Sequence, residues 1–134
     1  EKQVQKLEDS KVANIAAAKT IEPEKDAITF EDFSKMDLRV GTILEAAKMP
    51  KANKLLVMKI DTGIDVRTIV SGIAESFTPE EVVGKRVTVL VNLAPRTLRG
   101  VESQGMVLMT TDAAGKLAFV NPEGENISNG ATIN

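Results

Sequence analysis

Residues 78–93 read TPEEVVGKRVTVLVNL, and this stretch joins the pattern of a short helix to that of a β-strand. Thr78 suits the N-cap of a helix, Pro79 its first position, and Glu81 the return contact of a capping box. The glycine that follows the two valines is a typical helix terminator. Apolar side chains then alternate over residues 87–93, as in a strand that buries one face. The stretch therefore predicts a short helix that leads directly into a strand.

The same alternation occurs on both sides of this stretch. It predicts strands over Leu38–Ala46, Leu56–Ile60, Val66–Val70 and Met106–Thr110, and a weaker one over Leu117–Val120. Asp61–Asp65 is a short hairpin connection with Gly63 available for a positive φ, and Gly41 marks a bulge or bend in the first strand. Three strands, a short helix and two more strands form the order of an OB-fold, an all-β, five-stranded Greek-key barrel that commonly binds nucleic acids. Periodicity alone leaves another small β-barrel or sandwich open.

The region ahead of the first strand has a different composition. Residues 1–27 are polar and rich in Ala, Lys and Glu, and we interpret them as a linker or a frayed helix that ends near Ile21–Pro23. Thr29 and the aspartate three residues later resemble a capping box, which predicts a short helical turn over Phe30–Ser34. We therefore expect a lead over residues 1–27 and one folded domain over residues 28–134.

The composition excludes most familiar enzyme chemistry. The 134 residues include neither Cys nor His, which removes thiolate nucleophiles, zinc ribbons and the commonest general base. The sequence has no run of eighteen apolar residues, secretory signal, Walker loop, dinucleotide fingerprint or calcium loop. We expect no catalysis by this chain alone, no cofactor, no bound metal and no membrane partner. The lack of Cys is compatible with a cytoplasmic location.

Positive charge is concentrated in the middle of a chain whose net charge is −2. Residues 38–106 carry 10 basic and 7 acidic side chains, whereas both flanking segments are acidic. We expect two basic loops, one after the first strand and one between the fourth and fifth strands, that carry Lys48, Lys51, Lys54, Arg96 and Arg99. In an OB-fold both loops flank the ligand-binding face, so these residues and Asn53 can contact phosphate and sugar oxygens. Any one lysine by itself is more often a solvating surface charge.

The aromatic residues argue against stacking of bases on exposed rings. Trp and Tyr are absent, and none of the four phenylalanines, Phe30, Phe33, Phe77 and Phe119, lies in the basic loops. We interpret each of them as a core or capping contact instead of a stacking platform. Nucleic acid should then be recognised by its backbone and shape, which favours a folded RNA over an extended strand.

The segment Ser103-Gln104-Gly105-Met106 stands at the predicted entrance to the fifth strand. Its glycine allows the backbone of a partner to approach closely. Ser103 has no histidine to activate it, and the spacing offers no lysine instead, so we do not expect a nucleophile. Taken singly, Ser103 suits a turn hydroxyl and Met106 a core position.

Six short motifs in order carry a family resemblance. They are Phe30-Glu31-Asp32-Phe33, Asp37-Leu38-Arg39-Val40-Gly41, Asn53-Lys54-Leu55, Val70-Ser71-Gly72-Ile73-Ala74, Asn92-Leu93-Ala94-Pro95-Arg96 and Ser103-Gln104-Gly105-Met106. Together they resemble the tRNA-binding domain appended to bacterial methionyl-tRNA synthetases. That domain is shared with free-standing bacterial tRNA-binding proteins and eukaryotic synthetase-associated factors. Six ordered motifs are far more specific than any one of them.

The resemblance implies an OB-fold with a C-terminal β extension that forms a homodimer and binds tRNA by its overall shape, without reading the anticodon. The residues to which it assigns tRNA contact are Lys54, Ser103 and Met106, with Arg96 and Arg99 as phosphate contacts. Asn53 is added for its hydrogen-bond donor, and Lys51 for its charge alone. Catalysis belongs to the rest of the synthetase.

The long lead and the absence of an initiator Met favour the C-terminal module of a methionyl-tRNA synthetase, with the catalytic core in cis. Such a module supports the formation of methionyl-tRNA in translation. Two alternatives of the same fold stay open: a free-standing tRNA-binding protein, and a homodimeric chaperone associated with bacterial secretion. The composition disfavours an independent enzyme.

Overall fold

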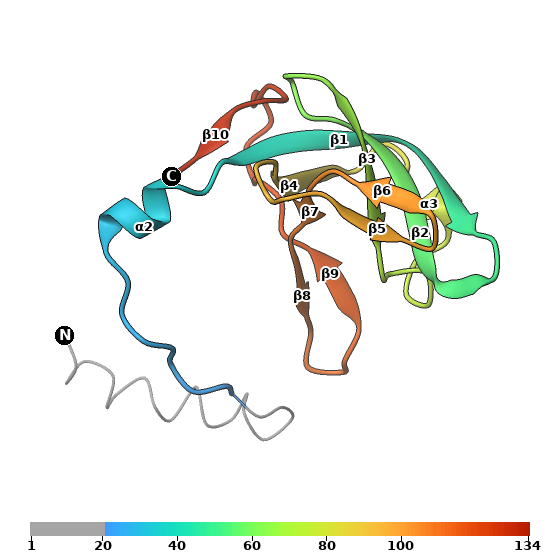
Figure 1. Ribbon diagram of the computed structural model, residues 1–134, viewed down its shortest axis with the longest axis horizontal. Coiled ribbons are helices and arrows are strands. Elements are labelled where there is room, and N and C mark those ends of the chain that lie inside the picture. The colour runs from blue at the N-terminus through green and yellow to red at the C-terminus, as the bar shows by residue number, and fades with distance from the viewer. Residues whose placement is uncertain (1–20) are drawn as a thin grey trace.

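An antiparallel sheet curved into a barrel is the centre of the computed structural model, which describes residues 21–134 (Figure 1). Its strands follow the order β3-β2-β1-β4-β7. They are β1 (Leu38–Met49), β2 (Ala52–Asp61), β3 (Val66–Ser71), β4 (Arg86–Leu90) and β7 (Met106–Val107), and β10 (Thr132–Ile133) pairs with the start of β1. The remaining elements are α2 (Phe30–Ser34), α3 (Pro79–Val82), a hairpin of β5 (Arg96–Leu98) and β6 (Val101–Ser103), and a hairpin of β8 (Met109–Thr111) and β9 (Leu117–Phe119).

The two edges of the barrel sheet meet. β3 lies at one edge and β7 at the other, and the end of β6 with the segment that enters β7 bonds to β3. The amide of Gln104 donates to the carbonyl of Thr68 at 2.8 Å, and the amide of Val70 donates to the hydroxyl of Ser103 at 2.9 Å. These bonds leave β3 without a free edge along this part of its length. The strand order with this closure is that of a five-stranded Greek-key barrel, and the predicted OB-like fold is confirmed.

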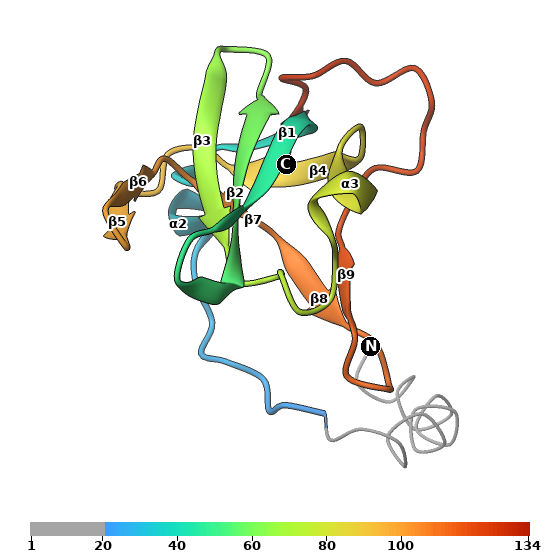
Figure 2. The ribbon, with the colours of Figure 1, turned by 90° about the vertical axis from the view of Figure 1, so that its right-hand side faces the viewer.

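The core consists of the inward faces of the four long strands. Its largest fully buried members include Ile43, Leu56, Met58, Ile60, Ile69, Val87 and Val89. Full burial of each such side chain contributes about 1.5–3 kcal/mol. α3 lies at one end of the barrel, where Val82 is buried in the same core (Figure 2). The alternation in the sequence therefore corresponds to the inner face of the barrel.

The two predicted helices form where their capping residues indicate. At α3 the Thr78 hydroxyl accepts the Glu81 amide, and the Glu81 carboxylate accepts the Thr78 amide at 2.8 Å. Gly84, with φ of 90°, follows the helix and lets the chain turn into β4. At α2 the Thr29 hydroxyl accepts the Asp32 amide at 3.1 Å. Both helices begin at the predicted residues.

The first two strands are longer than predicted, and the fourth and fifth depart further from their predicted bounds. The predicted fifth strand over residues 106–110 is divided, because β7 pairs with β4 in the barrel whereas β8 pairs with β9 in a separate sheet. The fourth strand ends at Leu90 instead of Leu93. The Val91 amide still donates in register to the carbonyl of Asp37, but the Asp37 amide donates to the side chain of Asn92 at 2.9 Å instead of to the carbonyl of Val91, so the ladder ends there.

Gly41 is not the site of the predicted bulge. It pairs in register with Val87 of β4, and the two register shifts between β1 and β2 fall at Ile43/Glu45 and at Lys48/Met49. A Cβ atom on Gly41 would lie 3.0 Å from the carbonyl oxygen of Asp61. Gly41 is therefore required for the close approach of β1 and β2.

The phenylalanines divide into three that are partly buried and one that is not. The rings of Phe77 and Phe119 lie 4.9 Å apart and pack against the main core, which fixes the β8–β9 hairpin to the barrel. Phe33 is partly buried. Phe30 is 79% exposed, so the core prediction is wrong for this residue. The reason is that α2 stands off the end of the barrel and buries none of its residues (Figure 1).

The predicted lead is described only in its last part. Residues 21–29 contain no helix or strand and are exposed. The predicted linker or helix over residues 1–20 falls outside the described residues. The proposed division at residue 28 therefore stays a prediction.

Candidate nucleic-acid interface

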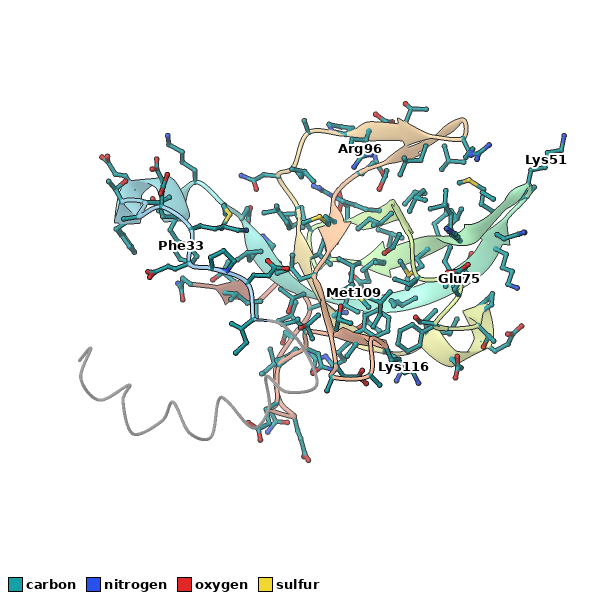
Figure 3. The ribbon with its side chains drawn as sticks, turned by 90° about the horizontal axis from the view of Figure 1, so that it is seen from below. Phe33, Lys51, Glu75, Arg96, Met109 and Lys116 are labelled. Carbon is teal, nitrogen blue, oxygen red and sulfur yellow. The ribbon has the colours of Figure 1, made fainter. Side chains whose placement is uncertain are left out.

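The first group of predicted contacts lies at the far end of the β1–β2 hairpin. The turn there consists of only two residues, Pro50 and Lys51, so Lys48 and Lys54 lie on strands. The predicted loop after the first strand is wrong, because strand pairing continues up to the turn. Proline at the first central position and a φ of 63° at Lys51 match a type II turn. Lys51 extends from the tip of the hairpin (Figure 3).

The second group lies on the β5–β6 hairpin, a region predicted as a loop. Arg96 opens β5, and Arg99 and Gly100 form the turn with φ values of 53° and 86°. Positive φ at both central residues matches a type I′ turn, whose twist suits a two-residue hairpin. The alternating pattern missed this hairpin because each strand has only three residues and only one of the six side chains is buried.

A small second core brings the two hairpins together. Met49, Ala52 and Val70 are buried in it, and Leu98 and Val101 of the β5–β6 hairpin pack against them. The tip of one hairpin therefore rests on the end of the other. The β5–β6 hairpin lies on the outer side of β3 (Figure 2).

This packing places Arg99 beside the lysine-bearing start of β2. One surface cavity of about 500 Å³ is lined by Lys51, Ala52, Asn53, Lys54, Leu55 and Arg99. The side chains of Asn53 and Lys54 are exposed there. None of the six lining residues is acidic, so three positive charges act on one surface.

A second cavity, of about 340 Å³, adjoins the first at Leu55. It lies between the end of β3, the β5–β6 hairpin and β7, and its lining includes Arg96, Leu98, Ser103 and Met106. Arg96 is exposed, and Met106 is 43% exposed. The two cavities together, lined by the residues just named, are called the basic groove below.

Ser103 lies beneath the surface of the basic groove. It is 5% exposed, and its hydroxyl accepts the Val70 amide and donates to the Gly105 carbonyl at 3.3 Å. It ends β6 instead of opening the fifth strand, because the chain forms the β5–β6 hairpin first. The structure thus places Ser103 where it joins β6 to β3.

Arg67, which sequence reasoning missed, attaches the base of the β5–β6 hairpin to β3. Its guanidinium donates to the carbonyls of Val91 and Gln104, one on each side of the hairpin, and pairs with Asp65 at 2.9 Å. The side chain of Gln104 in turn accepts the amide of Thr68. The whole hairpin is thereby held at both ends. The one sequence signal for this role is a charged residue inside a short strand.

Lys51 and Arg99 occupy strained backbone positions. Within residues 21–134 they are the only residues other than glycine that have a positive φ. Such turn positions favour Gly or Asn, and another residue there costs about 1 kcal/mol. Backbone strain of this kind is concentrated at functional sites, and here both strained residues are cationic and line the same cavity.

The described part of the chain contains neither a membrane-spanning helix nor a cluster of metal-binding side chains. Both helices within residues 21–134 are too short to cross a bilayer. In the same part of the chain no three carboxylates are grouped so that they could hold a metal ion. The chemistry of the site therefore rests on cationic and amide donors.

A family model described as "Putative tRNA binding domain" matches residues 38–131, which contain the barrel strands and the whole basic groove. The chain belongs to this tRNA-binding domain family. The methionine–tRNA ligase of Flavobacterium johnsoniae is 72% identical over 134 residues, which are 100% of this chain and 19% of the ligase. The chain thus spans about a fifth of the length of the curated relatives that it matches.

Solved structures share the fold of this tRNA-binding domain. A MetRS related protein from Pyrococcus horikoshii superposes with a TM-score of 0.75 and 35% identity over 81% of this chain and 99% of that chain. The chaperone CsaA from Bacillus anthracis superposes with a TM-score of 0.72 and 29% identity over 81% and 100% of the two chains. The family resemblance predicted from the six motifs is confirmed. The chain matches a tRNA-binding module of methionine–tRNA ligases and not a complete ligase.

Proposed function

We propose that this domain binds tRNA by its overall shape through the basic groove. The observation that carries the proposal is the position of Lys51, Lys54 and Arg99 around one cavity, with Arg96 at the adjoining one. Cations that contact phosphates hold a folded RNA whatever its sequence. Asn53 adds a donor for sugar oxygens. In this proposal Met106 touches the RNA, and Ser103 acts from beneath the surface.

The salt dependence of tRNA binding tests this proposal. If three or four phosphates are neutralised, the logarithm of affinity should fall against the logarithm of salt concentration with a slope of about −2 to −4. Lys54→Ala should reduce that slope by about one unit and weaken different tRNAs equally. Lys59→Ala removes an exposed charge from the same strand outside the groove and should leave the slope unchanged. A flat salt response, or a loss confined to one tRNA, contradicts the proposal.

We further propose that the domain is the C-terminal module of a cytoplasmic methionine–tRNA ligase, with the catalytic core in cis. Support comes from relatives of that name which match the whole chain over 19% of their length. A tethered RNA-binding module raises the local concentration of tRNA at the catalytic core. Deletion of residues 28–134 from the full ligase should raise KM for tRNA and leave kcat little changed. An unchanged KM would contradict this role.

Homodimerisation is the remaining part of the proposal. Ile28, Phe30 and Met36 are exposed apolar residues at the α2 end of the chain, and the cavity beside α2 is lined in part by Phe33 and Ile133. An exposed apolar patch of this kind favours association with another protein surface. This end of the barrel lies away from the hairpin tips (Figure 3). Two copies joined here would present two basic grooves to one tRNA, which strengthens binding.

The likeness to the chaperone CsaA favours a second candidate function, the protection of unfolded protein. Aggregation of an unfolded client, measured with and without tRNA, separates the two candidates. Client protection together with a failure to bind tRNA at low salt would support the chaperone function. Binding of tRNA without client protection would support the ligase module.

A further inference from the structure

We infer that the second cavity of the basic groove receives one unpaired nucleobase of the bound RNA. This cavity, the base pocket, is lined in part by Leu55, Gly72, Arg96, Leu98 and Met106. The inference rests on the proposed tRNA binding and adds contact with a base to contact with phosphates. It makes the presence of an unpaired nucleotide, and not its identity, a feature that the domain recognises.

The base pocket has an apolar lining that is open to solvent. Leu55 of β2, Leu98 of β5 and Met106 of β7 reach it from three different strands. Gly72 and Gly105 add almost no side-chain volume, which leaves the space of about 340 Å³ open. The Met106 thioether is flexible and polarisable, so it adapts to a flat ring of any base. A ring seated here would remove the exposed part of Met106 from water.

The charges around the base pocket favour a nucleotide over other apolar ligands. Arg96 lies at the pocket, and Lys54 and Arg99 lie at the adjoining cavity. Within residues 21–134 no carboxylate forms an ion pair with any of these three cations. Their charge is therefore available to the phosphates on either side of a seated base. An arginine also stacks on the face of a nucleobase through its planar guanidinium.

The buried polar side chain beneath the base pocket, Ser103, is already bonded within the protein. The Ser103 hydroxyl is engaged by Val70 and Gly105, so it offers no free group for reading the edge of a base. Contact through an apolar face and an arginine plane is sequence-tolerant, because every base has a π-face. The pocket thus distinguishes an unpaired base from a paired one without reading sequence. A fully paired duplex has no base to offer, whereas the loops of a folded tRNA do.

Methyl NMR of the 134-residue chain labelled at its five methionines tests the inference. Met106→Leu identifies the Met106 resonance. We expect tRNA to move this resonance through the ring current of a stacked base, and a fully paired RNA duplex with the same number of phosphates to leave it in place. The Met36 methyl, which lies beside α2 outside the groove, should not move with either RNA.

Binding measurements give a second readout. Met106→Lys should weaken tRNA binding by about 5- to 150-fold, the loss typical of one stacked base, and should not weaken duplex binding. Met106→Leu keeps an apolar contact and should retain most of the tRNA affinity. Thermal unfolding is the control, and both variants should be folded because Met106 is an exposed position.

Three results would overturn the inference. They are a Met106 resonance that tRNA leaves in place, equal movement with tRNA and duplex, and movement caused by an acidic peptide in place of RNA. If tRNA still binds with the Lys54-dependent salt slope, only the base pocket is wrong. If tRNA does not bind at low salt, the proposed function itself fails.

Discussion

The Ser103 hydroxyl accepts the buried amide of Val70 at 2.9 Å, so a side chain of β6 takes the position that a carbonyl has in an ordinary strand pair. Ser103→Ala leaves this amide without a partner and should lower the free energy of unfolding by about 1–3 kcal/mol, as measured by urea denaturation. The affinity for tRNA should fall while its salt slope stays the same, because Ser103 makes no phosphate contact. Ser71→Ala, in the lining of the same cavity, is the control and should leave stability nearly unchanged. A reduced salt slope for Ser103→Ala would indicate direct contact instead.

Arg67 is expected to act on tRNA binding through the β5–β6 hairpin. Arg67→Met keeps the apolar stem but removes the bonds to Val91 and Gln104. Hydrogen exchange should accelerate over residues 96–103 and not in β1 or β2, and tRNA affinity should fall several-fold with an unchanged salt slope. Arg39→Met removes a comparable ion pair, to Asp37 at 2.8 Å, and Arg39 makes no bond to the β5–β6 hairpin. This control should leave both the rate of hydrogen exchange in the β5–β6 hairpin and the affinity for tRNA unaltered.

Glycine at either strained turn position should make the protein more stable and weaken its binding of tRNA. Lys51→Gly and Arg99→Gly relieve a positive φ, so each should raise the free energy of unfolding by about 1 kcal/mol. Each should also reduce the salt slope of tRNA binding by about one unit. Lys48→Gly is the matched control: Lys48 lies on β1 without a positive φ, so glycine there should destabilise by about 0.5–1 kcal/mol. Destabilisation by Lys51→Gly would refute the assignment of strain.

Phe30 tests the proposed homodimer. Phe30→Ser removes the most exposed of the large apolar side chains in residues 21–134 and should shift the chain from dimer to monomer in sedimentation velocity. The affinity for tRNA should then fall through loss of the second groove, with the fold unchanged. Ile64→Ser, at the exposed β2–β3 turn, should leave the dimer intact. A wild-type chain that stays monomeric at high concentration would contradict the dimer.

Gly63 lies where the C-terminal segment crosses the β2–β3 turn. A Cβ atom at Gly63 would come 2.4 Å from the Cα of Gly130, and φ there is 84°. Gly63→Ala should therefore destabilise by about 2–4 kcal/mol, as the sum of backbone strain and overpacking. Gly115 has a similar φ of 89° with no heavy atom within 4 Å of the added carbon. Gly115→Ala should therefore destabilise the protein only through backbone strain, by about 1–2 kcal/mol as measured by thermal unfolding.

The barrel strands and both helices could be predicted because each has a strong local signal. Alternation with a period of two indicates the inner faces of β1–β4, and cap residues such as Thr78 fix where the helices begin. The boundaries that failed depend on contacts distant in sequence. β4 ends early because the side chain of Asn92 accepts the amide of Asp37, 55 residues away, and no local pattern near Val91 contains that information.

The candidate site could be predicted in part. Charge and loop position indicated Lys54 and Arg99, which the structure brings to one cavity. The packing that unites them, with Leu98 and Val101 on the second core, is a tertiary contact between short elements and leaves no periodic signal. Arg67 was missed for the same reason, since its carbonyl partners lie 24 and 37 residues away. Its ion pair with Asp65 is local, but it does not reveal those partners.

β1 crosses the whole barrel, and its length determines a geometry for any polypeptide attached ahead of α2. Its 12 residues extend over at most about 40 Å between the side of α2 and β10 and the tip that carries Lys51. β1 therefore has the point of attachment at one end and the proposed RNA-binding groove at the other. In the proposed ligase module, a bound RNA would therefore lie at the end of β1 opposite to the point where the preceding residues join. A longer preceding segment would let the start of β1 move, but the distance from there to the hairpin tip at Lys51 would stay the same.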